Sequence, residues 1–435
     1  MPQDAFANRR DVLEQRVAST PRLLERPIVR GEGAFLWDDR GKRYLDFISG
    51  HDGAITGHSH PRVVSAIREQ AGRLLHRPPV LAAHPVLERL EAGLGERLPD
   101  SLQHLVFAGS GADAVADALQ LARWATGRYN VIVLQRAVRG EASSAARVAV
   151  QGPTLRRPGQ PPVLGLYVAP YAYCYRCPKA EAAPERYGYA HCCGWPLEEV
   201  RFLLKSESPP EETAAILVEP VLAQAGYVVP PASFLSGLKE ICREHGILLV
   251  FDEVHSGFGR SGRFFALEHT GVVPDILVMG HGLASGLSLA GIAVSPALRE
   301  WLPPYEGVGD PLAWAAAEAT IQVLEEERLL QNAAIIGREL LERLKSLQAR
   351  YPALGEVRGQ GLMVGVEFVV PGGRTPDKDR TRDVQRACLE AGLLLSRCGV
   401  DGNVLRWAPP LVIGRTELEE ALAIFEHSLA GVISS

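Results

Sequence analysis

The chain has 435 residues, of which 46% are hydrophobic, and its formal net charge is −5. This size allows a large buried core and exceeds the usual length of one domain, so we expect one large and one small domain. The negative net charge argues against nucleic acid as a partner.

The N-terminal part of the chain predicts a location and a first structural unit. Residues 1–16 contain no apolar run of the kind that a secretory signal needs, so we expect a cytoplasmic protein. The segments Gly33–Asp38 and Gly41–Phe47 are rich in apolar and aromatic residues and are separated by a turn signal. This pattern predicts a hairpin with a glycine-containing turn.

A turn of small residues follows the apolar run Leu105–Phe107. It spans Gly109 to Ala114, and the helical pattern that begins there continues to Arg123. A turn of this kind presents backbone N–H groups to an anion, and the helix dipole adds to the attraction. Taken alone, the turn indicates either an anion site or an ordinary tight connection.

Four of the seven cysteines lie close together in the sequence. Cys174 and Cys177 form a C-x-x-C pair, and Cys192 and Cys193 are adjacent, with His191 beside them. Four thiolates can surround a zinc ion, although adjacent cysteines rarely both bind one ion. The pattern leaves three alternatives open: a structural metal at these four residues, disulfides, or an ordered insert with buried thiols.

Acidic residues follow two strand-like runs. Glu219 comes directly after residues 214–218, and Asp252 and Glu253 come directly after residues 247–251. In open α/β sheets, ligands bind beyond the carboxyl ends of the strands, so we expect carboxylates here to lie near a ligand.

The stretch Ile276–Leu298 lacks Asp, Glu, Lys and Arg and is long enough to span a membrane. Glycine, serine, histidine and proline interrupt it, however, which favours a strand, a loop and a second strand inside a soluble core. We therefore expect no membrane partner.

The order of the elements predicts an α/β fold. Between about residues 80 and 310, strand-like runs alternate with helical patterns, which indicates a mostly parallel sheet covered by helices. A helical stretch at about Leu312–Arg350 then leads to a smaller α+β region. The predicted division is an N-terminal segment of the small domain over residues 1–80, a large domain over 81–320, and a connecting helix with the C-terminal small domain over 321–435.

Several motifs together resemble one known family. Asp252-Glu253-Val254 is followed by Gly257-Phe258-Gly259-Arg260, and Arg406 precedes the dipeptide Pro409-Pro410. With the turn at Ser110, these segments resemble the class III aminotransferases, which are pyridoxal phosphate (PLP) enzymes of fold type I. The subgroup that the chain most resembles holds the archaeal-type 4-aminobutyrate aminotransferases and amino-acid racemases.

The resemblance implies a fold, an assembly and a set of site residues. It implies a large domain with a mostly parallel sheet of the seven-stranded type, a small α+β domain, and a homodimer with the site at its interface. Arg406 would bind a substrate carboxylate, and the residue at Asp252 would pair with the pyridinium nitrogen of PLP. The cofactor-binding residues implied are Ser110, Gly111, Ala112, Val138, Arg139, Glu219, Asp252, His255 and Glu306.

The departures from the family pattern gather at the cofactor. His281 stands at the position of the lysine that holds PLP as a Schiff base, and imidazole has no primary amine for that bond. Val138 stands in place of the aromatic residue that stacks on the ring, so stacking is lost. His255 stands in place of a glutamine, and Glu306 aligns with the threonine that reaches the phosphate, where a carboxylate repels the phosphate.

Three functions remain open on this basis. The first is a degenerate aminotransferase-fold protein that acts through a ligand or a partner, such as an active relative. The second is an enzyme that acts on a carboxylate-bearing amine or keto substrate, holds PLP or pyridoxamine phosphate (PMP) without a covalent link, and uses His281 as a general acid and base. The third is a repurposed site in which Asp252, His255, His281 and Asp310 converge on a metal or another small ligand.

Overall fold

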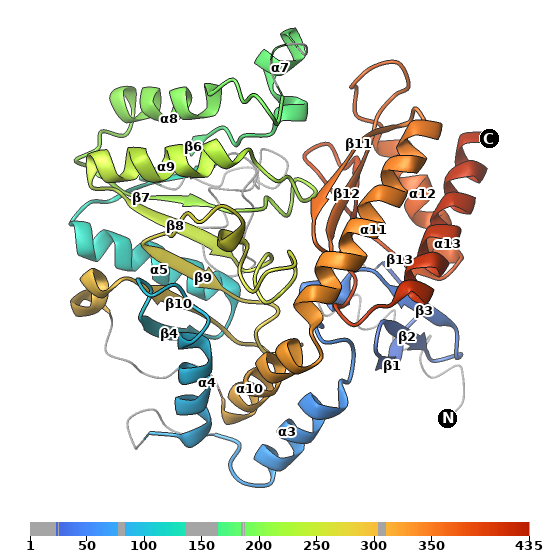
Figure 1. Ribbon diagram of the computed structural model, residues 1–435, viewed down its shortest axis with the longest axis horizontal. Coiled ribbons are helices and arrows are strands. Elements are labelled where there is room, and N and C mark those ends of the chain that lie inside the picture. The colour runs from blue at the N-terminus through green and yellow to red at the C-terminus, as the bar shows by residue number, and fades with distance from the viewer. Residues whose placement is uncertain are drawn as a thin grey trace, which may run out of the picture.

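The computed structural model describes residues 23–24, 26–76, 83–134, 164–183, 186, 188–302 and 310–434. A seven-stranded sheet forms the centre of this described part (Figure 1). Its strand order is β4-β10-β9-β8-β7-β5-β6, and only β10 runs antiparallel to its neighbours. The strands are β4 (His104–Ala108), β5 (Asn130–Leu134), β6 (Leu166–Ala169), β7 (Thr213–Val218), β8 (Leu248–Glu253), β9 (Ile276–Met279) and β10 (Ala290–Val294).

The central strands are apolar because both faces of the sheet are covered. Every residue of β5, β7, β9 and β10 is buried. Helix α5 (Gly111–Thr126) packs against β7 to β10, and α9 (Ala232–His245) packs against β7 and β8. The predicted α/β fold with a mostly parallel seven-stranded sheet is therefore confirmed.

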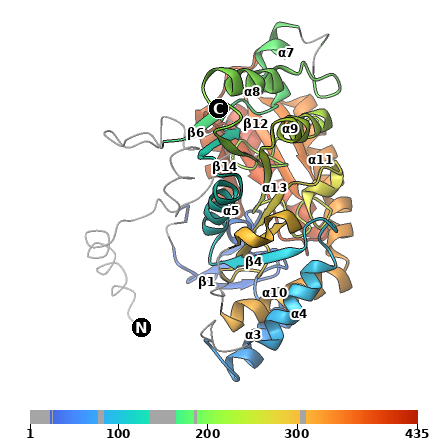
Figure 2. The same ribbon diagram turned by 90° about the vertical axis from the view of Figure 1, so that its left-hand side faces the viewer.

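Further helices surround the large sheet (Figure 2). Helix α8 (Trp195–Ser206) packs on α9 and β6, and the short η2 (Cys174–Arg176) and α7 (Pro178–Ala182) precede it. At the other end, α3 (Pro61–Ala71) and α4 (Pro85–Gly95) pack on α10 (Pro311–Glu326). Two short 3-10 helices, η3 (Ala266–His269) and η4 (Pro296–Trp301), lie in the connections before β9 and after β10.

Two four-stranded sheets lie beside the large sheet, on the right of Figure 1. One has the order β1-β2-β3-β13, and β3 pairs in parallel with β13, so the two ends of the chain share a sheet. The other has the order β11-β12-β15-β14. The strands are β1 (Ile28–Glu32), β2 (Phe35–Asp38), β3 (Arg43–Asp46), β11 (Leu354–Gln360), β12 (Met363–Phe368), β13 (Leu393–Leu394), β14 (Ser396–Cys398) and β15 (Val404–Trp407).

Two local predictions are confirmed and one is wrong. Strands β2 and β3 form the predicted hairpin, with Gly41 in the turn at φ +81°, and β9 and β10 form the predicted strand–loop–strand. The predicted long helix over 312–350 is two helices, α10 and α11 (Leu329–Arg350). Arg328 separates them because it adopts a left-handed conformation, with φ +54°, which an α-helix does not accommodate.

Helices α11, α12 (Lys378–Glu390) and α13 (Arg415–Ser434) pack together next to the smaller sheets. In the described part of the chain, no helix combines the length and the apolar character needed to cross a membrane. The predicted domain boundaries at residues 80 and 320 stay a prediction.

Candidate functional site

The candidate site lies at the carboxyl ends of β8 and β9, next to the N-terminus of α5. Val254, which follows β8, fills the space between Gly111 at the start of α5 and Gly280 after β9. A Cβ atom on Gly111 would lie 2.7 Å from a Val254 methyl carbon, and one on Gly280 would lie 2.9 Å from it. Glycine is therefore required at both positions, and the turn before α5 packs directly against the ends of both strands.

Ser110 begins α5 and is held by the helix itself. Its Oγ accepts the N–H of Asp113 at 3.2 Å and donates to Asp113 Oδ2 at 2.7 Å. The first backbone N–H groups of a helix have no partner inside the helix, so Gly111 and Ala112 lie at an end that attracts anions. This geometry agrees with an anion site and leaves the identity of the anion open.

Asp252 lies at the next-to-last position of β8 and is 3% exposed. Its Oδ1 accepts the N–H of Val254 at 3.0 Å. In the parallel register, Asp252 of β8 lies opposite Val278 of β9. Val278 precedes His281 by three residues in the sequence. The structure thus brings Asp252 to the strand end where the sequence predicts it.

His281 lies two residues beyond β9 and is partly exposed. Its ring centroid is 4.7 Å from that of His255 and 6.2 Å from that of His51. His255 is 5% exposed, and its Nδ1 lies 2.8 Å from Oδ2 of Asp52. His255 and His281 are therefore neighbours, and the buried Asp52 carboxylate holds His255.

Asp52 is a site residue that the sequence did not reveal. It ends a left-handed turn, Ser49–Asp52 (labelled α2), in which its φ is +69°. Burial acts to raise the pKa of Asp52, but His255, Arg406 and Arg260 outweigh this effect and hold the pKa well below its usual range. Asp52 is thus an anion, and because a carboxylate only accepts hydrogen bonds, Nδ1 of His255 is the donor.

Arg406 belongs to β15, in one of the smaller sheets, and is 3% exposed. Its Nε donates to Ser396 Oγ at 3.0 Å, and its guanidinium lies 5.6 Å from the centre of the Tyr227 ring. Among the described residues, its Nη1 has no hydrogen-bond partner. A buried donor without a partner costs about 1–3 kcal/mol, so this nitrogen is suited to an anionic ligand.

Tyr227 and Glu219 complete the buried surroundings of these charges. The Tyr227 hydroxyl donates to Asp52 Oδ1 at 3.3 Å. Glu219 is 2% exposed, and its Oε2 accepts the N–H of Ala223 at 3.0 Å, so this carboxylate orders the loop after β7. The negative charge of Glu219 also helps to raise the pKa of Arg406.

Glu253 has a structural role that differs from that of Asp252. Its carboxylate accepts the N–H groups of Ala266 and Leu267, at 2.6 and 2.8 Å, and the hydroxyl of Ser256 at 3.1 Å. It therefore anchors the start of η3. Burial raises the pKa of Glu253 from its ordinary value of 4.5 to about 7.

This pKa shift predicts how stability depends on pH. The folded state binds the Glu253 proton more tightly, so wild-type stability falls as the pH rises from the unfolded pKa through the folded one. Because glutamine does not titrate, the wild type should lose roughly 2–3 kcal/mol relative to Glu253→Gln between about pH 5 and 8. Urea unfolding at several pH values measures this difference, and a Glu69→Gln control, which changes an exposed ion pair, should show no such trend.

Some predicted site residues are not placed, and the predicted metal sites are not supported. Val138, Arg139 and Glu306 lie outside the described residues. Asp310 does not join Asp252, His255 and His281, because it begins α10 and pairs with His76 at 3.2 Å. Within the described ranges, no group of three or more His, Cys, Asp or Glu side chains is arranged to hold a metal ion, and this includes Cys174, Cys177, Cys192 and Cys193.

The chain's amines do not fit a lysine-linked cofactor at this site. All six lysines lie in the described ranges. Lys42 donates to the Glu390 carbonyl, while Lys179 and Lys239 pair with Glu198 and Asp275. The other three are exposed on α8, α11 and α12, namely Lys205, Lys345 and Lys378. None of these six lysines is therefore part of the group formed by Asp252 and the N-terminus of α5.

Comparison with known proteins identifies relatives over nearly the whole chain. The family model described as "Aminotransferase class-III" matches residues 17–429. An alanine/serine racemase of Pyrococcus horikoshii is 34% identical over 93% of this chain and 86% of its own length. A 4-aminobutyrate aminotransferase of Escherichia coli is 32% identical over 96% of this chain and 97% of its own length.

Solved structures show the same fold. A thermostable (S)-enantioselective omega-transaminase from Thermomicrobium roseum has a TM-score of 0.89 and 31% identity, over 99% of both chains. An amine transaminase from an uncultivated Pseudomonas species, solved in its PLP-bound form, has a TM-score of 0.84 and 29% identity, over 96% of this chain and 97% of its own.

Proposed function

This chain belongs to the class III aminotransferase family, and we propose that it is a member that no longer carries out lysine-dependent transamination but keeps a pocket for a small molecule that carries a carboxylate. The observation that carries the proposal is His281, which stands at the end of β9 beside Asp252, where no lysine lies nearby. Imidazole cannot form the covalent link that this chemistry requires.

The described residues support a pocket that binds an anion and moves a proton. Arg406 would bind the ligand carboxylate, because it is buried and its Nη1 has no hydrogen-bond partner among the described residues. Asp52 would orient His255 through its Nδ1. His281, next to His255, would accept or donate a proton near neutral pH. We also propose a homodimer with the site at its interface, as the family resemblance implies.

A second candidate function is favoured by the groups that the site retains. PLP or PMP could be held without a covalent link, with Asp252 on the ring nitrogen and the N-terminus of α5 on the phosphate. Bound there, the pyridine ring would supply an electron sink. Asp252, buried at the end of β8, is the observation that favours this function, since a site with no cofactor has little need of it. His281 would then serve as the general acid and base.

Incubation with PLP, followed by borohydride reduction and peptide mass spectrometry, tests the loss of the lysine link. With one equivalent of PLP, we expect no single lysine of the wild-type protein to gain the reduced cofactor in stoichiometric yield, because no amine lies in the site, and only partial labelling of the exposed lysines. A stoichiometric adduct on one lysine, or steady amino-group exchange by the wild type, would overturn the proposal.

Calorimetric titration with PMP and with simple carboxylates separates the two candidate functions. Tight PMP binding that weakens in Asp252→Asn would favour the second function. Binding of carboxylates alone, weakened in Arg406→Met, would favour the first. An Arg343→Met control removes an exposed arginine that pairs with Glu419 on the surface, and it should leave both affinities unchanged.

A further inference from the structure

Arg406 and Asp52 carry opposite charges that act on each other, and yet they do not pair. The charge of Arg406 helps to lower the pKa of Asp52. Among the residues that the structure describes, Asp52 forms its ion pair with His255, and none joins it to Arg406. Buried opposite charges attract each other strongly, so a direct pair is expected unless other groups hold them apart.

Tyr227 contacts both charged groups. Its hydroxyl donates to Asp52 Oδ1 at 3.3 Å, and the guanidinium of Arg406 lies 5.6 Å from the centre of its ring. Burial, together with the charge of Asp52, raises the pKa of Tyr227, so the hydroxyl stays protonated and able to donate. Because His255 donates to Oδ2, each oxygen of the Asp52 carboxylate has a donor that is not an arginine.

The backbone of Tyr227 is held in a conformation that its side chain does not favour. Its φ is +55°, and that of Gly226 before it is +91°. Arg358, buried on β11, donates from Nε and Nη2 to the carbonyls of Gly226 and Ala225, both at 2.9 Å. A Cβ atom on Gly365 would lie 2.2 Å from the Gly226 carbonyl oxygen, so β12 also packs directly against this loop.

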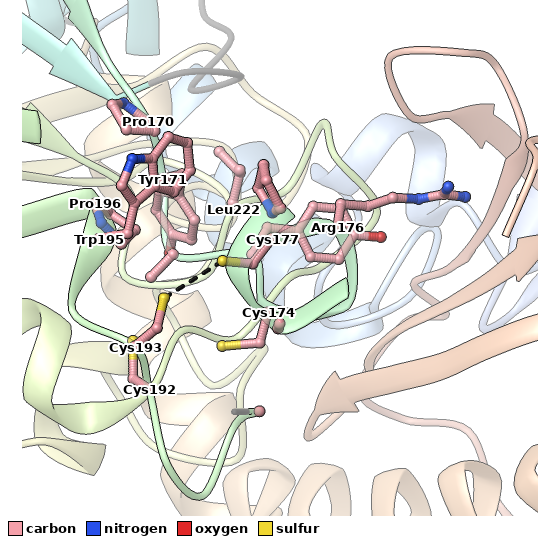
Figure 3. Close-up of a pocket in the computed structure, with 15 residues that line it drawn as sticks. Pro170, Tyr171, Cys174, Arg176, Cys177, Cys192, Cys193, Trp195, Pro196 and Leu222 are labelled. Carbon is pink, nitrogen blue, oxygen red and sulfur yellow. Dashed lines mark hydrogen bonds between the residues drawn. The ribbon is translucent and has the colours of Figure 1, made fainter. Parts of the chain in front are cut away.

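Further contacts hold Arg358 and the rest of the loop after β7. Arg358 Nη1 donates to Glu367 Oε2 at 2.7 Å, and Arg176 Nε donates to Glu367 Oε1 at 2.7 Å. Figure 3 shows Arg176 directed away from the sulfur atoms of a cavity of about 220 Å³, and Leu222 lines the same cavity. Leu222 pairs with Val228 through two backbone hydrogen bonds. The loop is therefore fixed at its base and at its tip.

We propose, on the basis of the function proposed above for Arg406, that Tyr227 is a positioning residue that keeps Arg406 open to the ligand carboxylate by holding Asp52 away from it. With the hydroxyl in place, Asp52 needs no further donor, and Nη1 of Arg406 is left to the ligand. Without the hydroxyl, Asp52 Oδ1 is a buried acceptor that needs a donor, and Arg406 Nη1 supplies one. The internal carboxylate then competes with the ligand for the same guanidinium.

The test compares the wild type with Tyr227→Phe, which keeps the ring and loses only the hydroxyl. The full-length proteins are heated at increasing acetate concentrations, with chloride added to keep the ionic strength constant, and the shift of the unfolding midpoint gives the acetate affinity. We expect Tyr227→Phe to bind acetate about tenfold more weakly. The matched control is Tyr44→Phe, because the buried Tyr44 hydroxyl also donates to a carboxylate, that of Asp38, and its loss should leave the acetate affinity unchanged.

A second substitution separates this role from a general loss of structure. In a double variant that combines Tyr227→Phe with Asp52→Asn, the competing charge is absent, so acetate should bind at least as tightly as it does to the wild type. A purely structural role of the hydroxyl would not be rescued in this way. A crystal structure of Tyr227→Phe without acetate should show an Asp52 oxygen within about 4 Å of the Arg406 guanidinium.

The possible results distinguish the role of Tyr227 from the proposed function. If acetate does not stabilise the wild type, or stabilises Arg406→Met equally, the carboxylate pocket fails, and the role of Tyr227 fails with it. If acetate binds the wild type through Arg406 and binds Tyr227→Phe equally well, only the role of Tyr227 is overturned. The same conclusion follows if the double variant keeps the tenfold loss, or if Asp52 stays away from Arg406 in the structure of Tyr227→Phe.

Discussion

His281→Lys is expected to give the chain the covalent bond to PLP that, as we propose, the wild type does not make. A lysine there would follow the end of β9, near Asp252 and the N-terminus of α5, which we propose as the groups that would hold the cofactor. We expect borohydride reduction to fix PLP on the peptide that contains residue 281. Amino-group exchange should rise by roughly 10²–10⁴-fold over the wild type, the usual contribution of a positioned acid–base group.

The matched control for this substitution is His51→Lys. His51 is exposed, and its ring centroid lies only 6.2 Å from that of His281, but it belongs to the turn after β3 and not to the end of β9. A lysine at residue 51 tests whether any amine near the site is sufficient to bind PLP covalently, and we expect no PLP adduct at this residue. An adduct at residue 51 and none at residue 281 would show that the cofactor position has been misassigned.

An intermediate result with His281→Lys is also informative. If PLP is fixed at residue 281 but amino-group exchange stays at the wild-type level, the site has lost more than the amine. The sequence points to Val138 and Glu306 as other changes, since they stand in place of a stacking aromatic residue and of the threonine that reaches the phosphate. A variant that combines His281→Lys with Val138→Phe would then be the next step.

Much of the fold was predictable because it depends on local sequence. The apolar runs of β5, β7 and β9 are buried over their whole length, and such runs are typical of a parallel sheet that is covered on both faces. The proximity of Asp252 and His281 also follows from sequence, because consecutive parallel strands end at the same edge. The break at Arg328 was not predictable, since no glycine or proline marks it.

The part of the site that was missed depends on contacts between distant segments. Asp52 and His255 are 203 residues apart in the sequence. Their pairing depends on a left-handed turn that no local sequence pattern predicts. Tyr227 reaches Asp52 from a third segment, again with a positive φ, of +55°. The one available signal was the His51-Asp52 dipeptide, which places two ionisable residues between the apolar Phe47-Ile48 and Ala54-Ile55.

Asp52→Asn is expected to destabilise the protein by about 3–5 kcal/mol at neutral pH, the usual result of removing one partner from a buried set of charges. The buried Arg260 and Arg406 would lose the carboxylate whose charge lies near them. Asparagine tolerates a positive φ and keeps an oxygen that can accept the N–H of His255. The decrease in the free energy of unfolding should therefore come from the lost negative charge and not from a change in the shape of the turn. Urea unfolding of the wild type and the variant measures this decrease in the free energy of unfolding.

The pH dependence gives this prediction a definite sign. Because the folded-state pKa of Asp52 is lowered, its contribution to stability is complete above the unfolded pKa of about 3.9 and is lost as the pH falls through the folded value. The difference between wild type and Asp52→Asn should therefore be constant between about pH 6 and 8 and shrink only below about pH 4. An Asp39→Asn control, in a partly exposed pair with Arg26, should cost no more than about 1 kcal/mol.

Added carboxylate distinguishes a ligand pocket from a purely structural charge network. In Asp52→Asn, the two buried arginines carry positive charge that a small anion can neutralise. If the pocket beside Arg406 admits ligands, formate or acetate should raise the midpoint of unfolding of the variant more than that of the wild type, since binding to the folded state alone stabilises it. Equal effects on both proteins would mean that Arg406 is closed to ligands, and the proposed pocket would have to be abandoned.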